Sequence, residues 1–204
     1  VLAVEVFPPR PGGLTIGFLD WNPRPPDNNM GLWREVNLIC TGPVSLVSPV
    51  VESDLDQSNE NADLTVRTML VNRSDQLRSG FVRGEIGKIS FEKPYTIQPG
   101  ERKEINIDPT DAPGLHIEDA TLWWPHNLGT PHLHQLNLEV EEGKTVSDRK
   151  KIRFGIREVD DYINETGHRG YKVNGKQVLV KGAGWVDGLC LADSREKVKA
   201  QMAS

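Results

Sequence analysis

The sequence predicts a mainly β protein whose centre is a sandwich of two antiparallel sheets, and three features of the chain lead to this prediction. First, apolar and polar residues alternate in several segments between residues 40 and 157, which is typical of half-buried antiparallel strands. Second, polar clusters rich in Gly, Pro, Asn and Asp separate these segments. Third, the spacing leaves no room for crossover helices, so the strands must follow one another through turns.

The first 39 residues predict two or three strands around a proline-rich loop. The chain opens on "VLAVEVFPP", which has the composition of a strand, and continues through "FLDWNPRPPDNNMGLWREV", which has no helical period. Two strands without a partner sheet are not stable alone. We therefore expect residues 1–39 to depend on partner strands from outside this segment.

Residues 40–157 carry the alternating segments and are predicted to form a domain of their own. Roughly seven strands over ~115 residues is the size of an immunoglobulin-like β-sandwich. Turns are expected at "NRSD", "QPGE", "PTDAPG" and "EEGKT". The apolar positions that share one face of a strand, and that we expect in the core, are Leu64, Val66, Leu70, Ile105, Ile107, Leu136, Leu138, Val140, Ile152, Phe154 and Ile156.

Residues 158–204 predict a different structure, the beginning of a β/α unit. "VNGK" is a tight-turn signal between two short strands, and "QVLVKGAGW" indicates a strand followed by a Gly-rich loop. A helix is expected in "DSREKVKAQMAS", capped by Asp193 or Ser194, with Val198 and Met202 on one face. Because the chain opens within a strand and closes within a helix, we expect it to be an internal piece of a longer protein.

The composition argues against two classes of partner. The 204-residue chain has a formal net charge of −5 and no basic stripe, so no nucleic-acid partner is expected. No apolar run approaches the ~18 residues of a membrane span, so no membrane partner is expected either. A disulfide between Cys40 and Cys190 is one alternative, but two isolated buried thiols are the favoured interpretation.

Three stretches together resemble glycoside hydrolase family 2. "DWNPRPPDNNMGLWREVNL" is similar to the last strands of that family's jelly-roll sugar-binding domain. "ATLWWPHNLGTPHLHQLNLEV" resembles a segment near the end of its immunoglobulin-like domain, with His134 where Tyr is usual. "RFGIREV" followed by "YKVNGKQVLVKGAGW" resembles the junction into the catalytic (β/α)8 barrel. The resemblance implies a jelly-roll tail in 1–39, an immunoglobulin-like β-sandwich in 40–157 and the start of a (β/α)8 barrel in 158–204.

Within the family, "DWNP" and "GAGW" resemble the branch of β-mannosidases and exo-β-glucosaminidases. The β-galactosidase pattern has Arg-His-Glu after the Gly-rich strand, where this chain has "WVD". Mannosidases usually show Trp-Asp-Trp-Gly-Pro in the jelly roll, whereas this chain has "LDWNP". The departure favours the glucosaminidase side of the branch.

The resemblance implies sugar-binding roles for Asp20, Trp21, Trp185 and Asp187. The loop that holds Asp20 is implied to lean over the mouth of the barrel, where a carboxylate accepts hydrogen bonds from sugar hydroxyls and an indole packs on a pyranose ring. Trp185 and Asp187 follow the predicted first barrel strand, and such strand ends line the active site of barrels. On the residues alone, the alternative is that Asp20 caps a turn and the tryptophans fill corners.

No catalytic residue is assigned within the chain. Retaining glycosidases use two carboxylates roughly 5 Å apart, and in this family both are glutamates on later barrel strands, the first after an Asn. The dipeptides Asn59-Glu60 and Asn164-Glu165 fall in a predicted polar loop and a predicted hairpin tip instead. The catalytic pair is therefore expected beyond Ser204.

No metal or cofactor is expected. The histidines of "PHNLGTPHLH", among which His132 and His134 are predicted to share a face, do not have the spacing of common zinc ligands. "DNN" offers oxygen ligands but matches no calcium-loop pattern. "WWP" is interpreted as a rigid corner between two strands.

The chain is thus predicted to be a piece of a retaining exo-β-glycosidase that acts on a terminal β-glucosaminide or β-mannoside, with carbohydrate as its partner. A bacterial glycan-degrading enzyme of this kind is expected in the periplasm or outside the cell. The alternative is a stand-alone, non-catalytic β-sandwich module that binds carbohydrate or protein. A parent reading frame that continues for about 300 residues, enough for a barrel, distinguishes the enzyme from the module.

Overall fold

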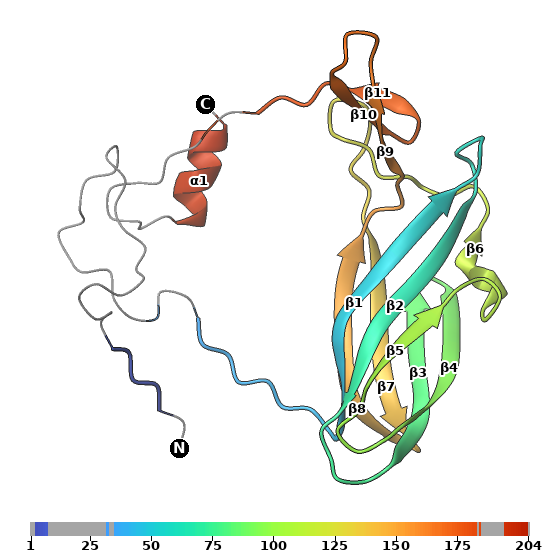
Figure 1. The fold of residues 1–204 in the computed structure, drawn as a ribbon, viewed down its shortest axis with the longest axis vertical. Helices are drawn as coiled ribbons and strands as arrows, with labels where there is room; N and C mark the ends of the chain where they lie inside the picture. The colour runs from blue at the N-terminus through green and yellow to red at the C-terminus, as the bar shows by residue number, and fades with distance from the viewer. Residues whose placement is uncertain (1–2, 8–31, 33–34, 183, 185–193, 204) are drawn as a thin grey trace. The chain divides into compact units, whose positions relative to one another are not determined.

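The computed structural model describes residues 3–7, 32, 35–182, 184 and 194–203 (Figure 1). The chain divides into two units, one of residues 39–180 and one of residues 1–38 with 181–204. The first unit contains the strands β1 (Val44–Leu55), β2 (Ala62–Asn72), β3 (Arg78–Ile86), β4 (Ile89–Ile97), β5 (Arg102–Ile107), β6 (His116–Ile117), β7 (His134–Glu142), β8 (Thr145–Phe154), β9 (Val159–Ile163), β10 (Arg169–Val173) and β11 (Lys176–Val178). It also contains a short 3-10 helix, η1 (Pro113–Leu115), and the second unit contains the helix α1 (Arg195–Met202).

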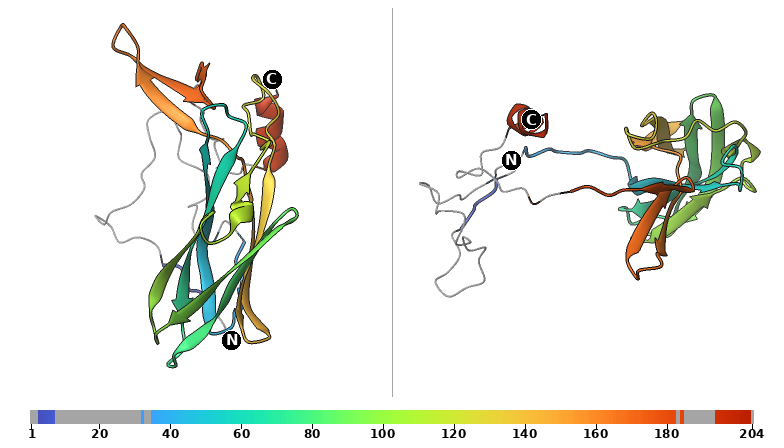
Figure 2. Two further views of the ribbon diagram at one scale, coloured as in Figure 1. Left: turned by 90° about the vertical axis from the view of Figure 1, so that its right-hand side faces the viewer. Right: turned by 90° about the horizontal axis from the view of Figure 1, so that it is seen from above.

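The strands of residues 44–154 form two antiparallel sheets. One has the order β1-β2-β5, with β6 also pairing with β2, and the other has the order β4-β3-β7-β8. A third sheet, β11-β10-β9, stands at one end of the sandwich (Figure 2). The mainly β immunoglobulin-like sandwich predicted from the alternation is therefore confirmed.

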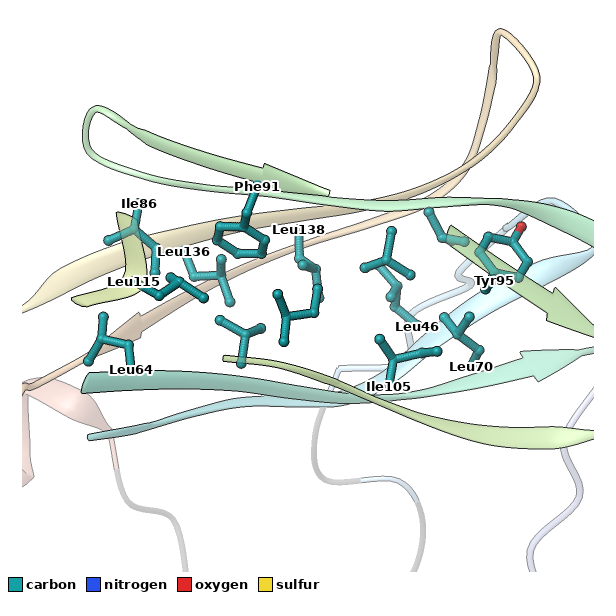
Figure 3. Packing of buried hydrophobic residues seen from close by; sticks show 14 of the residues in the cluster. Leu46, Leu64, Leu70, Ile86, Phe91, Tyr95, Ile105, Leu115, Leu136 and Leu138 are labelled. Atoms are coloured by element: carbon teal, nitrogen blue, oxygen red, sulfur yellow. The ribbon is translucent and has the colours of Figure 1, made fainter. Parts of the chain in front are cut away.

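The core lies between the two sheets and follows the alternation closely. Figure 3 shows Leu64, Leu136, Leu138 and Phe91 pointing into the space between the sheets. All the predicted core residues are buried except Ile152, which is partly buried because β8 is an end strand of its sheet. Burial of these side chains is the main stabilising contribution to the fold, at roughly 1.5–3 kcal/mol for each one.

Side chains join the two sheets along the β1–β8 side of the sandwich. The register of β8 against β7 shifts between Val140 and Glu141, which is the signature of a β-bulge. Beside this bulge, Ser147 Oγ donates to the Val44 carbonyl (2.7 Å) and accepts from the Val44 amide (3.0 Å). Asp148 Oδ2 accepts from the Leu46 amide (2.8 Å). These bonds take the place of a backbone ladder between the end strands of the two sheets.

On the β4–β5 side of the sandwich, two lysines reach from one sheet to the other in opposite directions. Lys93 on β4 donates to the carbonyl of Asn106 on β5 (2.7 Å). Lys103 on β5 donates to the carbonyl of Thr96 on β4 (2.9 Å). Lys93 also pairs with the carboxylate of Asp111 at 2.7 Å. The end strands β4 and β5 are thus linked through side chains as well.

The flanking segments differ from the sequence predictions at the N-terminal side. Residues 3–7 and 35–38 form no strand, so the strand predicted at the start of the chain is not found; residues 8–31 and 33–34, where the other predicted strands would fall, lie outside the described residues. A strand needs a hydrogen-bonded neighbour, and neither segment pairs with any described residue.

Cys40 is exposed because it precedes β1 outside the core, so the predicted buried thiol is wrong here. Cys190 lies outside the described residues.

The helix predicted near the C-terminus is confirmed as α1. Ser194 is its N-cap, and its side chain accepts a hydrogen bond from the Lys197 amide (3.1 Å), which satisfies a free donor of the first turn. Among the described residues, no helix has both the length and the apolar character that crossing a bilayer requires.

Candidate functional site

The four residues predicted to bind sugar, Asp20, Trp21, Trp185 and Asp187, lie outside the described residues, so their roles stay predictions. The "DNN" stretch lies outside them as well. The candidate site within the described chain is the end of the sandwich where residues 155–158 leave β8 and enter the β9–β11 sheet.

Trp123 and Trp124 form a corner in the chain shortly before β7, as the sequence predicted. The Trp123 amide donates to the Ile156 carbonyl (2.8 Å), and the Trp124 amide donates to the Thr130 carbonyl (3.0 Å). A Cβ atom at Gly155 would lie only 2.6 Å from the Trp123 side chain, so this position has room only for glycine. The corner is therefore tied to the segment that follows β8.

Two cations cover the indole rings of the corner. The guanidinium of Arg157 lies 4.5 Å from the centre of the Trp123 ring, and the ammonium of Lys176 lies 4.6 Å from the centre of the Trp124 ring. Such contacts contribute about 0.5–1 kcal/mol each at exposed sites. Because Lys176 opens β11, the second contact reaches from the sandwich to the third sheet.

Asn174 lies at the point where these segments meet. It forms the predicted tight turn together with Gly175, and the two residues have φ values of 48° and 73°. The Asn174 side chain is buried, with Nδ2 donating to the Trp123 carbonyl (3.0 Å) and Oδ1 accepting from the Glu158 amide (2.9 Å). The turn was predicted from the Asn-Gly pair, but these side-chain bonds were not. The only hint in the sequence is that Asn, rather than Gly, occupies the first of two left-handed positions.

A hollow of about 500 Å³ lies between β1 and the end of β8. Its lining residues are Val51, Glu52, Ser53, Leu133, Arg153, Phe154, Gly155, Arg157 and Val159. Ser53 Oγ donates to the Arg157 carbonyl (2.8 Å), which joins the two walls. The lining contains one carboxylate, Glu52, which pairs with Arg67 at 2.9 Å. Retention needs two carboxylates, so this hollow is not arranged for glycoside hydrolysis.

Acidic residues gather where the chain enters β9. Burial raises the pKa of the Glu158 carboxyl above its ordinary value, and the charges of Asp160 and Asp54 raise it further. The Glu158 backbone is held by Asn174 on both its amide and its carbonyl. The raised pKa therefore belongs to a residue whose backbone is hydrogen-bonded to the Asn174 turn.

Both Asn-Glu dipeptides lie in loops, as predicted. Asn59 and Glu60 are in the turn between β1 and β2, and Asn59 has a φ of 57°. Asn164 and Glu165 are at the tip between β9 and β10, where Asn164 Oδ1 accepts from the His168 amide (2.8 Å). Asn164 thus organises its own turn and contacts no part of the sandwich through a hydrogen bond that the structure describes.

The predicted common face of His132 and His134 is confirmed. Their rings lie edge to face with centroids 4.6 Å apart, and His134 stacks on Phe154. His134 Nε2 lies 2.9 Å from the Thr121 carbonyl. These contacts show packing roles. In the part of the chain that the structure describes, no three His, Cys, Asp or Glu side chains are grouped to hold a metal ion.

The pair of His116 and Asp63 makes the sandwich sensitive to pH. His116 Nδ1 lies 2.6 Å from Asp63 Oδ1, and this hydrogen bond raises the pKa of His116, with nearby acidic charges adding to the effect. The pair therefore stabilises the fold below the pKa of unfolded histidine and loses this contribution as pH rises through the folded pKa. We expect Asp63→Asn to lower stability at about pH 5 but to have little effect at about pH 9.

Urea unfolding of both proteins at the two pH values, together with an NMR titration of His116, measures this difference. An equal effect of Asp63→Asn at both pH values would contradict the assignment of the pH dependence to this pair.

Comparison with known proteins gives a consistent result. The family model for glycosyl hydrolases family 2 matches residues 44–157. An exo-β-D-glucosaminidase of Streptomyces avermitilis is 39% identical over 186 residues, which are 90% of this chain and 21% of that protein. A mannosylglycoprotein endo-β-mannosidase of Lilium longiflorum is 28% identical over 187 residues, covering 83% and 19% of the two chains.

A solved structure extends the match beyond the sandwich. The exo-chitosanase CsxA of Amycolatopsis orientalis superposes with a TM-score of 0.80 and 30% identity, over 94% of this chain and 22% of that one. The chain thus spans about a fifth of the length of the relatives that it matches. Because they include a plant protein, the matched relatives are not confined to bacteria.

Proposed function

The chain belongs to glycosyl hydrolases family 2, and on this premise we propose that it is a piece of a retaining exo-β-glycosidase that releases a terminal β-linked glucosamine. The observation that carries the proposal is the likeness to the exo-chitosanase, with a TM-score of 0.80 over 94% of the chain. Identity is also higher to the Streptomyces glucosaminidase, at 39%, than to the Lilium mannosidase, at 28%. The "LDWNP" stretch, which departs from the mannosidase pattern, favours the same substrate.

Each part of the chain has a proposed role. Residues 1–39 end the jelly-roll domain, residues 40–157 are the immunoglobulin-like scaffold and residues 158–204 begin the barrel. The β9–β11 sheet, which the proposal assigns to the beginning of the barrel, belongs to the same compact unit as the sandwich.

The proposed chemistry of the chain itself is sugar binding. Asp20 and Asp187 accept hydrogen bonds from the terminal sugar, and Trp21 and Trp185 pack on its ring. Two carboxylates suit a sugar that carries an ammonium group, which a mannoside lacks. The acid/base and the nucleophile are the two glutamates on later barrel strands, beyond Ser204, so the chain contributes binding and position without proton transfer or nucleophilic attack.

The test is an assay of the longer protein on nitrophenyl β-glucosaminide, β-mannoside and β-galactoside. We expect the highest kcat/KM on the glucosaminide, and no turnover by the 204-residue chain alone, because neither of its Asn-Glu dipeptides lies at a barrel strand end. Preferred hydrolysis of the mannoside would contradict the proposed substrate. Sugar binding by the longer protein without hydrolysis of any of the three would instead support a non-catalytic module.

A further inference from the structure

We infer that Asn174 is a positioning residue, which fixes the β9–β11 sheet on the sandwich. Its effect on catalysis rests on the proposed function, since the predicted sugar-binding residues Trp185 and Asp187 come after β11. The attachment of the sheet to the sandwich through the Asn174 side chain, here called the joint, is argued from the geometry of the described residues alone.

Three hydrogen bonds from Asn174 link three segments of the chain. Nδ2 donates to the Trp123 carbonyl in the corner before β7, and Oδ1 accepts from the Glu158 amide in the segment between β8 and β9. The Asn174 amide donates to the Glu158 carbonyl at 3.0 Å. Asn174 is 2% exposed, so water cannot readily replace its side chain. Removal of the side chain would leave the Trp123 carbonyl and the Glu158 amide without these two partners.

Within residues 159–178 only Val173 and Asn174 are buried, so the third sheet is attached to the sandwich at this end. Val173 is 8% exposed and Asn174 2%, whereas Tyr171, two residues earlier, is 40% exposed and Ile163 at the far tip is 61% exposed. The contact of Lys176 with Trp124 lies at the attached end too. Because the third sheet is held at this end, the hydrogen bonds of Asn174 set the orientation of the sheet relative to the sandwich.

The side-chain role can be separated from the turn role by substitution. A φ of 48° suits Asn and Gly, so Asn174→Gly keeps the turn and removes both side-chain bonds. Asn174→Asp keeps an acceptor for the Glu158 amide but places a carboxylate oxygen against the Trp123 carbonyl. Asn164→Gly is the matched control, because Asn164 organises the turn at the opposite end of the same sheet.

Amide hydrogen exchange of the 204-residue chain tests the joint. We expect both Asn174 variants to accelerate exchange of the paired amides in residues 159–178 by about tenfold, with β2 and β7 unchanged. Asn164→Gly should affect only the tip between β9 and β10. Unchanged exchange in residues 159–178, an equal acceleration in Asn164→Gly, or a parallel acceleration of β2 and β7 would each overturn the inference.

The catalytic consequence is tested in the longer protein, well below its unfolding temperature. Both Asn174 variants should lower kcat/KM for nitrophenyl β-glucosaminide about tenfold, because small displacements far from the chemistry reduce the rate, and Asn164→Gly should not. Faster exchange with an unchanged kcat/KM would overturn the positioning role. An inactive unmodified protein would instead refute the proposed function, and the exchange experiment would still decide whether Asn174 holds the joint.

Discussion

Replacing Asp148 with alanine is expected to lower the free energy of unfolding by about 3 kcal/mol. The Asp148 carboxylate accepts hydrogen bonds from the amides of Leu46 and Arg149, both at 2.8 Å. Leu46 is 2% exposed, so its amide would lose its partner without gaining water. The bond to Leu46 also joins the two sheets, and its loss therefore weakens the sandwich at its β1–β8 side. Urea unfolding measured by circular dichroism gives the difference.

Glu139→Ala provides the matched control for Asp148→Ala. Glu139 on β7 pairs with Arg149, the residue that follows Asp148 on β8, at 3.3 Å. Exposed ion pairs contribute little, so this variant should change the unfolding free energy by less than about 1 kcal/mol. Equal losses in the two variants, or a loss below about 1 kcal/mol for Asp148→Ala, would show that the Asp148 bonds do not hold the sheets together.

In the longer protein, Asp20→Ala is expected to lower kcat/KM for a β-glucosaminide by a factor of ~10² or more, which corresponds to about 3 kcal/mol. The reason is the proposed acceptance of hydrogen bonds from the terminal sugar, since such contacts strengthen in the transition state. The melting temperature should change little. Steady-state kinetics on nitrophenyl β-glucosaminide, with a thermal melt of each variant, measures both quantities.

Asp75→Ala is a suitable control for Asp20→Ala, because Asp75 is an exposed carboxylate in the turn between β2 and β3. It should leave both the kinetics and the melting temperature unchanged. If Asp20→Ala keeps the full rate, or loses activity only because the protein unfolds, then Asp20 is a turn-capping residue and the predicted sugar contact is wrong.

The sandwich could be predicted because apolar and polar residues alternate along β2, β5 and β7. Leu64, Leu136 and Leu138 are fully buried where the alternation placed them. The turn at Asn174 was predictable for the same local reason, since the backbone angles that it needs are those that Asn and Gly adopt.

The attachment of the third sheet to the sandwich beside that turn could not be predicted, because the residues that bond there are distant in sequence. Asn174 bonds to Trp123, which is 51 positions earlier, and no local pattern reports such a contact. The bond between Asp148 and Leu46 spans 102 positions and was likewise not foreseen. The strand expected in residues 3–7 failed for the opposite reason: its composition is that of a strand, but a strand forms only where a neighbour pairs with it.

The crossed lysines have a consequence for the behaviour of the sandwich in a crowded solution. End strands of open sheets can recruit a strand from another molecule, and natural proteins prevent this with charges and proline at the edge. Lys93 and Lys103 bring two such charges to β4 and β5, and each occupies a carbonyl of the opposite strand. Pro94, next to Lys93 on β4, has no amide to offer. An incoming strand would have to displace both lysines and would gain an incomplete ladder. This side of the sandwich therefore resists the edge-to-edge pairing from which β-aggregates grow.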